Sequence, residues 1–174
     1  MNNRDKTRRI AVSSVLSALG VVMLYLGSMV EVLDISMAVI ASLICVFAVI
    51  EYGKGYPWLI FFVTAILSLL LLPSKTPAVM YAVFFGFYPI IKEKLERLPR
   101  VLSWVLKEII FNVAFVIMAV LVMFVFTVGE VVIDLPYIIG IVFLGELTFV
   151  LYDIAMTRLI SLYIFKLRKR FNIK

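Results

Sequence analysis

The sequence predicts an all-α, polytopic integral membrane protein, a six-transmembrane-helix bundle that forms one domain over residues 1–174. Hydrophobic residues make up 64% of the chain and charged residues only 16%, whereas soluble domains are about 45–50% apolar and about 25% charged. The apolar residues form long blocks, and a spanning helix needs about 20 of them. The formal net charge of +6 gathers on one predicted side, which indicates a membrane face and excludes a nucleic-acid-binding surface.

The first three hydrophobic blocks end at charges or at helix breakers. Block one, Ile10–Val30, follows a basic lead and ends at Glu31 and Asp34, two carboxylates that would be costly in lipid. It is too long for the apolar region of a signal peptide and lacks a small-x-small cleavage site, so we expect a retained helix. Block two, Ile35–Tyr52, stops at a turn rich in Gly and Pro. Block three, Trp58–Leu72, closes on a short turn flanked by prolines.

The second half of the chain adds three more blocks. Block four, Ala78–Ile91, has only about 14 residues, which predicts a short or tilted span or a re-entrant segment. Charged and apolar residues mix over Lys92–Lys107, which predicts an amphipathic helix on the cytoplasmic membrane surface, interrupted by Pro99. Block five runs from about Glu108 to Val128, and block six from Leu135 to about Phe165. Block six exceeds the length of a perpendicular span, so we expect it to tilt or protrude.

The basic residues predict the orientation. With six spans, the termini and the connections on their side carry 15 of the 17 Lys and Arg residues. The opposite side has only Lys75, and Arg158 lies within block six. The acidic residues of that opposite side are Glu31, Asp34, Glu130 and Asp134. The positive-inside rule therefore places both termini in the cytoplasm, with the chain in the cell membrane.

Block six carries the candidate substrate-binding residues. Glu146 lies about eleven residues from the outer end of the block, which at ~1.5 Å per residue is near the middle of the membrane. Asp153 follows two helical turns later, with Phe149 and Tyr152 on or near the same face. Such a stripe could bind the amine or ring N–H of a substrate, or carry a proton. The alternative is a protonated Glu146 carboxyl that is hydrogen-bonded to a neighbouring helix.

Blocks five and six also predict a structural ion pair. Arg158 lies toward the cytoplasmic end of block six, and Glu108 and Asn112 begin the antiparallel block five at a comparable depth. Because charges buried in a low dielectric need partners, we expect Arg158 to pair with Glu108, with Asn112 nearby.

Small residues recur at helical spacing in two blocks. In block one, Ser13 and Ser17 stand four apart, as do Ser14 and Ala18. Small ridges allow close helix approach in lipid, so these four residues are candidates for docking a partner subunit, with internal packing as the alternative. A second ridge lies in block two, where internal packing is at least as good an explanation; its members are Ala38, Ala41, Cys45 and Ala48.

The chain lacks the sequence motifs of catalysis. It contains no histidine and one cysteine, so disulfides within the chain, Cys/His metal sites and His-based acid–base chemistry are excluded. No phosphate-binding loop with Lys-Ser/Thr, no Gly-x-Ser-x-Gly and no His-Glu-x-x-His occurs. We therefore expect no enzyme activity, no cofactor and no metal. Because it lacks an ATP-binding loop, we also expect that the chain cannot power transport by itself.

The overall pattern resembles the substrate-binding S components of energy-coupling factor transporters. The resemblance rests on the basic N-terminus, the six segments, the short connection after block three and the four-residue spacing of small residues in block one. It implies a six-helix bundle that captures a vitamin-like micronutrient on the outer side. It also implies a transmembrane coupling subunit and cytoplasmic ATPases as partners. Ser13, Ser14, Ser17 and Ala18 match the family's Ala-x-x-x-Ala docking position loosely.

Two other functions fit the same hydropathy. One is a non-transporting scaffold similar to the rod-shape membrane protein MreD, whose role is partner assembly. The other is a small secondary carrier that uses Glu146 as its proton site.

Overall fold

A computed structural model describes residues 3–53, 55–126 and 135–167, and these residues are almost entirely helical. The chain divides into two compact units, Met1–Val125 and Phe126–Lys174. The all-α class predicted from the sequence is therefore confirmed for the described residues. The single domain over residues 1–174 remains a prediction.

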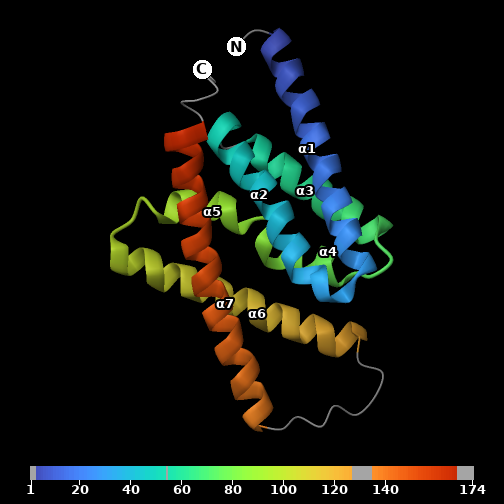
Figure 1. Cartoon of the computed structure of the whole chain (residues 1–174), viewed down its shortest axis with the longest axis vertical. Coiled ribbons are helices and arrows are strands. Elements are labelled where there is room, and N and C mark those ends of the chain that lie inside the picture. Colours follow the sequence, from blue (N-terminus) through green and yellow to red (C-terminus); the bar gives the residue numbers. More distant parts are fainter. Residues whose placement is uncertain (1–2, 54, 127–134, 168–174) are drawn as a thin grey trace. The chain divides into compact units, whose positions relative to one another are not determined.

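The first unit begins with three long helices. These are α1 (Asn3–Met29), α2 (Asp34–Tyr52) and α3 (Tyr56–Leu71), with a 3₁₀ turn over Glu31–Leu33 between the first two. Gly53 ends α2 with a φ of 74°, a conformation that side chains disfavour. Helices α1, α2 and α3 reverse direction from one to the next (Figure 1). Blocks one to three of the sequence thus correspond to helices, although α1 starts seven residues before Ile10 because the basic lead is helical as well.

Block four is an interrupted helix. It consists of α4 (Thr76–Met80), the π-helical segment η2 (Tyr81–Phe85) and α5 (Tyr88–Leu95). The Gly86 N–H donates to the carbonyl of Tyr81 at 2.7 Å, the five-residue spacing of a π-helix. Pro89 has no N–H to donate to the carbonyl four residues earlier, which favours a break at this point.

Two helices share the segment Lys92–Lys107, and its place on the membrane surface stays a prediction. Lys92 belongs to α5, and the chain turns between Leu95 and Arg100. A single helix, α6 (Arg100–Phe126), then includes most of block five. Pro99 directly precedes α6, a position where its missing N–H breaks no helical hydrogen bond. The expected interruption near Pro99 is therefore confirmed, but the rest of the segment starts a long apolar helix.

Small side chains fill the contacts among the first helices. The predicted ridge of α2 is fully buried, with Ala38, Ala41, Cys45 and Ala48 each 0% exposed. Several buried hydroxyls bond within their own helix: Ser17 donates to the carbonyl of Ser13, Ser42 to that of Val39 and Ser68 to that of Ala65. Block two therefore uses its ridge for internal packing, and these hydroxyls are each satisfied in part by their own helix.

Two basic side chains lie against helix ends in the first unit. The Arg9 guanidinium of α1 lies 5.9 Å from the ring centroid of Tyr52 and 6.0 Å from that of Tyr56, at the turn between α2 and α3. The Lys75 ammonium donates to the carbonyl of Leu72 at 2.6 Å, directly after α3. A cation there stabilises the carbonyl end of the helix.

The described part of the second unit consists of α7 (Leu135–Leu162) and a π-helical segment, η3 (Tyr163–Leu167). Together they cover predicted block six. The predicted outer acidic residues Glu130 and Asp134 lie outside the described residues.

Among the described residues, four helices are long and apolar enough to cross a membrane: Asn3–Met29, Asp34–Tyr52, Arg100–Leu121 and Ile138–Phe165. The apolar helix Tyr56–Leu71 is shorter. These helices fit a multi-pass membrane protein, whereas the predicted number of six spans is not confirmed.

Candidate functional site

Helix α1 has two different faces lined by small residues. One face is buried within the first unit and contains Ser13, Ser17 and Gly20. A Cβ atom added at Gly20 would lie 3.0 Å from the Thr64 methyl carbon, which shows how closely α1 and α3 approach. The Thr64 hydroxyl also lies 3.4 Å from the carbonyl of Ser17, as a long hydrogen bond. This face therefore serves helix packing inside the unit.

The opposite face of α1 is exposed. Ala11, Ser14 and Ala18 recur there at three- and four-residue spacing, and the larger Val15 and Val22 flank them. The four predicted docking residues thus divide into two pairs. Ser13 and Ser17 are buried, whereas Ser14 and Ala18 lie on the exposed face, and docking by these residues stays a prediction.

The predicted substrate-binding residues all lie on α7. Glu146, Phe149, Tyr152 and Asp153 all fall within its range, Leu135–Leu162. Spacings of three, four and seven residues place the four side chains along one side of the helix. The structure therefore gathers the predicted stripe on one helix, and its role in binding stays a prediction.

The predicted ion pair joins residues of different units. Glu108 and Asn112 lie on α6 of the first unit, and Arg158 lies on α7 of the second. The Asn112 amide donates to the carbonyl of Glu108, one turn earlier, at 3.0 Å. Pairing of Glu108 with Arg158 remains a prediction.

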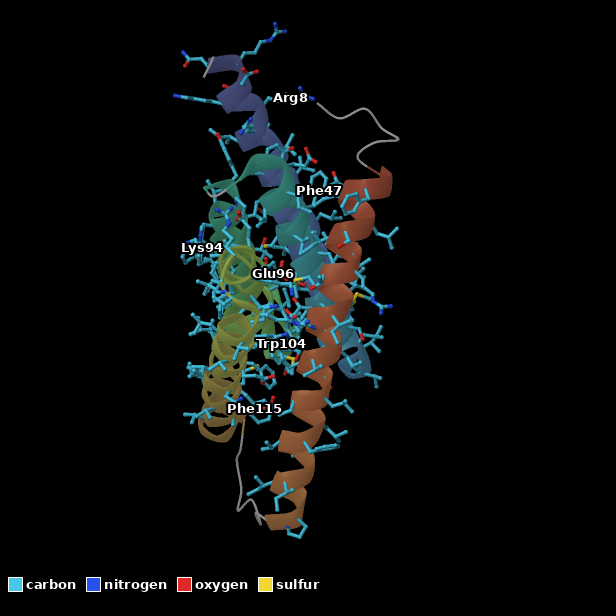
Figure 2. All side chains as sticks on the ribbon, turned by 90° about the vertical axis from the view of Figure 1, so that its left-hand side faces the viewer. Arg8, Phe47, Lys94, Glu96, Trp104 and Phe115 are labelled. Atoms are coloured by element: carbon cyan, nitrogen blue, oxygen red, sulfur yellow. The ribbon has the colours of Figure 1, made fainter. Side chains whose placement is uncertain are left out.

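A cluster of two buried lysines and one partly exposed glutamate links α5 to α6. The Lys92 ammonium lies 2.9 Å from Oε1 of Glu96, and the Lys107 ammonium lies 3.6 Å from the same oxygen. The two lysine side chains are only 1% and 5% exposed. The Lys107 Nζ also lies 5.3 Å from the ring centroid of Trp104 (Figure 2 labels Glu96 and Trp104). One carboxylate thus holds two helices together across the turn at Pro99.

Sequence reasoning missed this cluster. It assigned the charges of Lys92–Lys107 to a membrane-surface helix, because alternating charges are typical of a solvated face. The four-residue spacing of Lys92 and Glu96 is visible in the sequence, but the approach of Lys107, which lies on another helix, is not.

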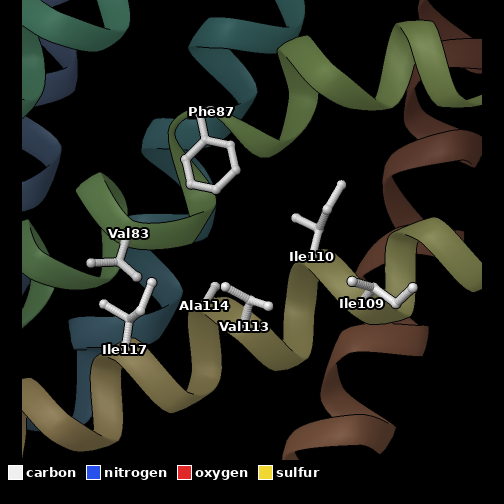
Figure 3. Close-up of a pocket in the computed structure, with 7 residues that line it drawn as sticks. All are labelled: Val83, Phe87, Ile109, Ile110, Val113, Ala114 and Ile117. Carbon is white, nitrogen blue, oxygen red and sulfur yellow. The ribbon is translucent and has the colours of Figure 1, made fainter.

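The interrupted helix borders an apolar groove in the first unit. The groove has a volume of about 330 Å³. Its lining comes from the η2–α5 junction and from α6, and all seven residues are apolar: Val83, Phe87, Ile109, Ile110, Val113, Ala114 and Ile117 (Figure 3). Such a surface can accept an apolar group, but it offers no side chain that would hydrogen-bond a polar solute.

One other buried polar contact of the first unit joins a thiol to a phenol hydroxyl. The Cys45 thiol and the Tyr81 hydroxyl lie 3.1 Å apart in the buried contact between α2 and η2. Among the described residues, no cluster of three or more His, Cys, Asp or Glu side chains could hold a metal ion.

Comparisons of the chain with protein-family models, with curated proteins and with solved structures find no match.

Proposed function

We propose that this chain is the membrane-embedded substrate-binding subunit of a larger transport assembly, similar to the S components of energy-coupling factor transporters. It would capture a small, vitamin-like organic micronutrient and deliver it to a coupling subunit driven by ATPases. The observation that carries this proposal is the division of α1 into two small-residue faces. One face packs inside the unit, and the other leaves Ala11, Ser14 and Ala18 exposed on a membrane-length helix. An exposed small-residue face suits close contact with a partner helix.

The stripe on α7 supports the capture of a solute. Acidic side chains within membrane-length helices are rare and often mark a solute pathway, and α7 carries two of them, Glu146 and Asp153. Together, a carboxylate, a phenol and a phenyl ring offer hydrogen bonding and stacking to a nitrogen-containing organic molecule. Glu146, Phe149, Tyr152 and Asp153 are therefore the proposed binding residues.

Native mass spectrometry of the gently extracted protein tests this function. A substrate-binding subunit should retain a small organic ligand and co-purify with the coupling subunit and the ATPases. Partners without any ligand would contradict substrate capture.

We further propose that both termini and the turn between α5 and α6 face the cytoplasm. Single cysteines at Arg100 and at Glu130, each in a Cys45→Ser background, should react from the inside and from the outside respectively. Position 100 carries the basic charge that the positive-inside rule assigns to the cytoplasm. Labelling of position 130 only from the inside would overturn this orientation.

The exposed face of α1 gives a prediction about docking. Ala18→Leu adds bulk on the exposed face, so we expect loss of partner assembly with the isolated chain still folded. Ser17→Leu is the matched comparison, because the Ser17 side chain is only 1% exposed and the packed interior has no room for the added bulk. We expect this variant to destabilise the isolated chain by about 1–3 kcal/mol. Co-purification and thermal unfolding separate the two effects. Normal assembly of the Ala18→Leu variant would remove this face from the proposal.

The charge of Glu146 gives a second prediction. Glu146→Gln keeps the size of the side chain and removes its charge, so the affinity for the retained ligand should fall roughly tenfold to a hundredfold, with little change in the melting temperature. If Glu146 is instead a protonated structural group, Gln should be tolerated, while Glu146→Leu should destabilise the fold by leaving a partner unsatisfied. Ligand titrations and melting curves of both variants decide between these roles.

A scaffold similar to MreD is the second candidate. The observation that favours it is the wholly apolar lining of the groove between η2 and α6, which gives a polar nutrient no recognition group. The same native mass spectra distinguish this function, because a scaffold would retain protein partners and no small organic ligand.

A further inference from the structure

The groove between η2 and α6 lies on a helix that is apolar enough to cross a membrane. Three of its lining residues, Ile109, Val113 and Ile117, are 45–55% exposed. In a bilayer, apolar surface of this kind is solvated by lipid chains, and a concave surface holds a chain more closely than a flat one. The groove residues all belong to the first unit (Figure 3).

The turn that leads into α6 is basic. Residues 92–107 contain five basic and two acidic side chains. Lys94, Arg97 and Arg100 are exposed there, and Arg97 pairs with Glu93. Within the described ranges 3–53, 55–126 and 135–167, neither Lys94 nor Arg100 forms an ion pair (Figure 2 labels Lys94). Clusters of exposed Lys and Arg beside membrane helices attract anionic lipid headgroups.

The distance between the basic turn and the groove matches the size of a lipid. Nine residues separate Arg100 from Ile109, and seventeen separate it from Ile117. At ~1.5 Å per residue these separations are about 13 Å and about 25 Å along α6. One leaflet of a bilayer is about 20–22 Å thick, half of the total with headgroups. A lipid with its headgroup near Arg100 would therefore place an acyl chain along the groove.

We propose that this groove is a binding site for one anionic phospholipid. One acyl chain lies against Phe87, Ile110 and Ala114, and the phosphate headgroup lies near Lys94 and Arg100. The neutral groove supplies apolar contact, and the basic turn supplies selectivity for negative charge. The site involves neither the solute nor the partner subunit, so a negative result for the lipid site would leave the proposed function unaffected, and the reverse also holds.

The test uses the full chain in a neutral detergent, titrated with phosphatidylglycerol or with phosphatidylcholine and followed by native mass spectrometry. We expect one phosphatidylglycerol to bind about tenfold or more tightly than phosphatidylcholine. The double variant Lys94→Gln/Arg100→Gln should lose this preference. The control Arg4→Gln/Lys6→Gln removes the same charge from exposed positions of α1 and should keep the preference.

The groove itself is tested by filling it. Val113→Trp places an indole in the groove from a side chain that is 55% exposed, and it should weaken the binding of both lipids about tenfold or more. Val105→Trp, on a residue of α6 that does not line the groove and is 49% exposed, is the matched control. If melting curves show that Val113→Trp does not fold, Ile117→Phe replaces it. Equal binding of the two lipids by the unmodified chain, or unchanged binding by the folded groove variant, would overturn the proposal.

Discussion

Glu96→Gln is expected to lower the free energy of unfolding by about 1.5–3 kcal/mol, the range for a hydrogen bond to a charged group. The Lys92 and Lys107 ammonium groups both lie within 4 Å of one Glu96 oxygen, and both lysine side chains are almost fully buried. Glutamine keeps the size of the side chain but removes the negative charge that these two cations share. Glu96 is 39% exposed, so water will reduce the loss. Chemical or thermal unfolding in detergent micelles measures the change.

Glu93→Gln provides the control on the same helix. Glu93 pairs with Arg97 at the same four-residue spacing, but the side chains are 32% and 64% exposed. A surface pair of this kind contributes about 0–1 kcal/mol. In the double variant Lys92→Met/Glu96→Gln, part of the loss should be recovered, because one of the buried cations is removed together with its partner. Equal losses in the free energy of unfolding for Glu96→Gln and Glu93→Gln would show that the cluster stabilises the fold no more than a surface ion pair does.

Gly86→Ala is expected to destabilise the first unit by about 3 kcal/mol, the upper end of the range for overpacking. A Cβ atom at this position would lie 2.6 Å from a ring carbon of Phe61 and 2.8 Å from a ring carbon of Tyr81. Both rings are buried, with Tyr81 only 1% exposed, so neither can move without displacing its neighbours. A fall in the melting temperature, with a retained helical circular dichroism spectrum at low temperature, is the expected measurement.

Gly140→Ala is the matched control, since a Cβ atom at Gly140 in α7 meets nothing within 4 Å. Because alanine is the better helix former, this variant should be unchanged or more stable by up to about 1 kcal/mol. If Gly86→Ala behaved in the same way, the close approach of Phe61 to the interrupted helix would not be needed for stability.

Most helices could be predicted from the sequence because their ends carry strong local signals. The turn between α2 and α3 contains Gly53, which ends α2, and Pro57, which suits the first turn of α3. Charges mark other ends, such as Asp34 at the start of α2. These signals act within a few residues and need no tertiary information.

The interruption of block four could be predicted only in part. Its short length indicated an unusual span, but the run Tyr81–Phe85 is as apolar and aromatic as a regular membrane helix. The π-helical turn depends on packing, since Gly86 allows the Phe61 ring from α3 to approach the backbone. A contact between residues 25 positions apart is not visible in a local pattern.

The candidate site residues could also be predicted only in part, because local spacing does not show which side of a helix packs against another. Four-residue spacing identified both Ser13 with Ser17 and Ser14 with Ala18, but spacing alone cannot tell which pair faces the inside. The packing of Thr64 against Gly20 decides it. On α7, by contrast, the stripe that includes Glu146 and Asp153 follows directly from helical periodicity, which needs no second helix.

The self-contained hydroxyl bonds among α1, α2 and α3 have a mechanical consequence. Ser17, Ser42 and Ser68 each donate to a carbonyl of their own helix, so sliding one helix along the next need not break these bonds. Sliding is opposed by the close fit of small side chains and by the long hydrogen bond from Thr64 to the Ser17 carbonyl. A bundle joined in this way can change the tilt of its helices in bilayers of different thickness, an adjustment that membrane helices make at modest cost per ångström.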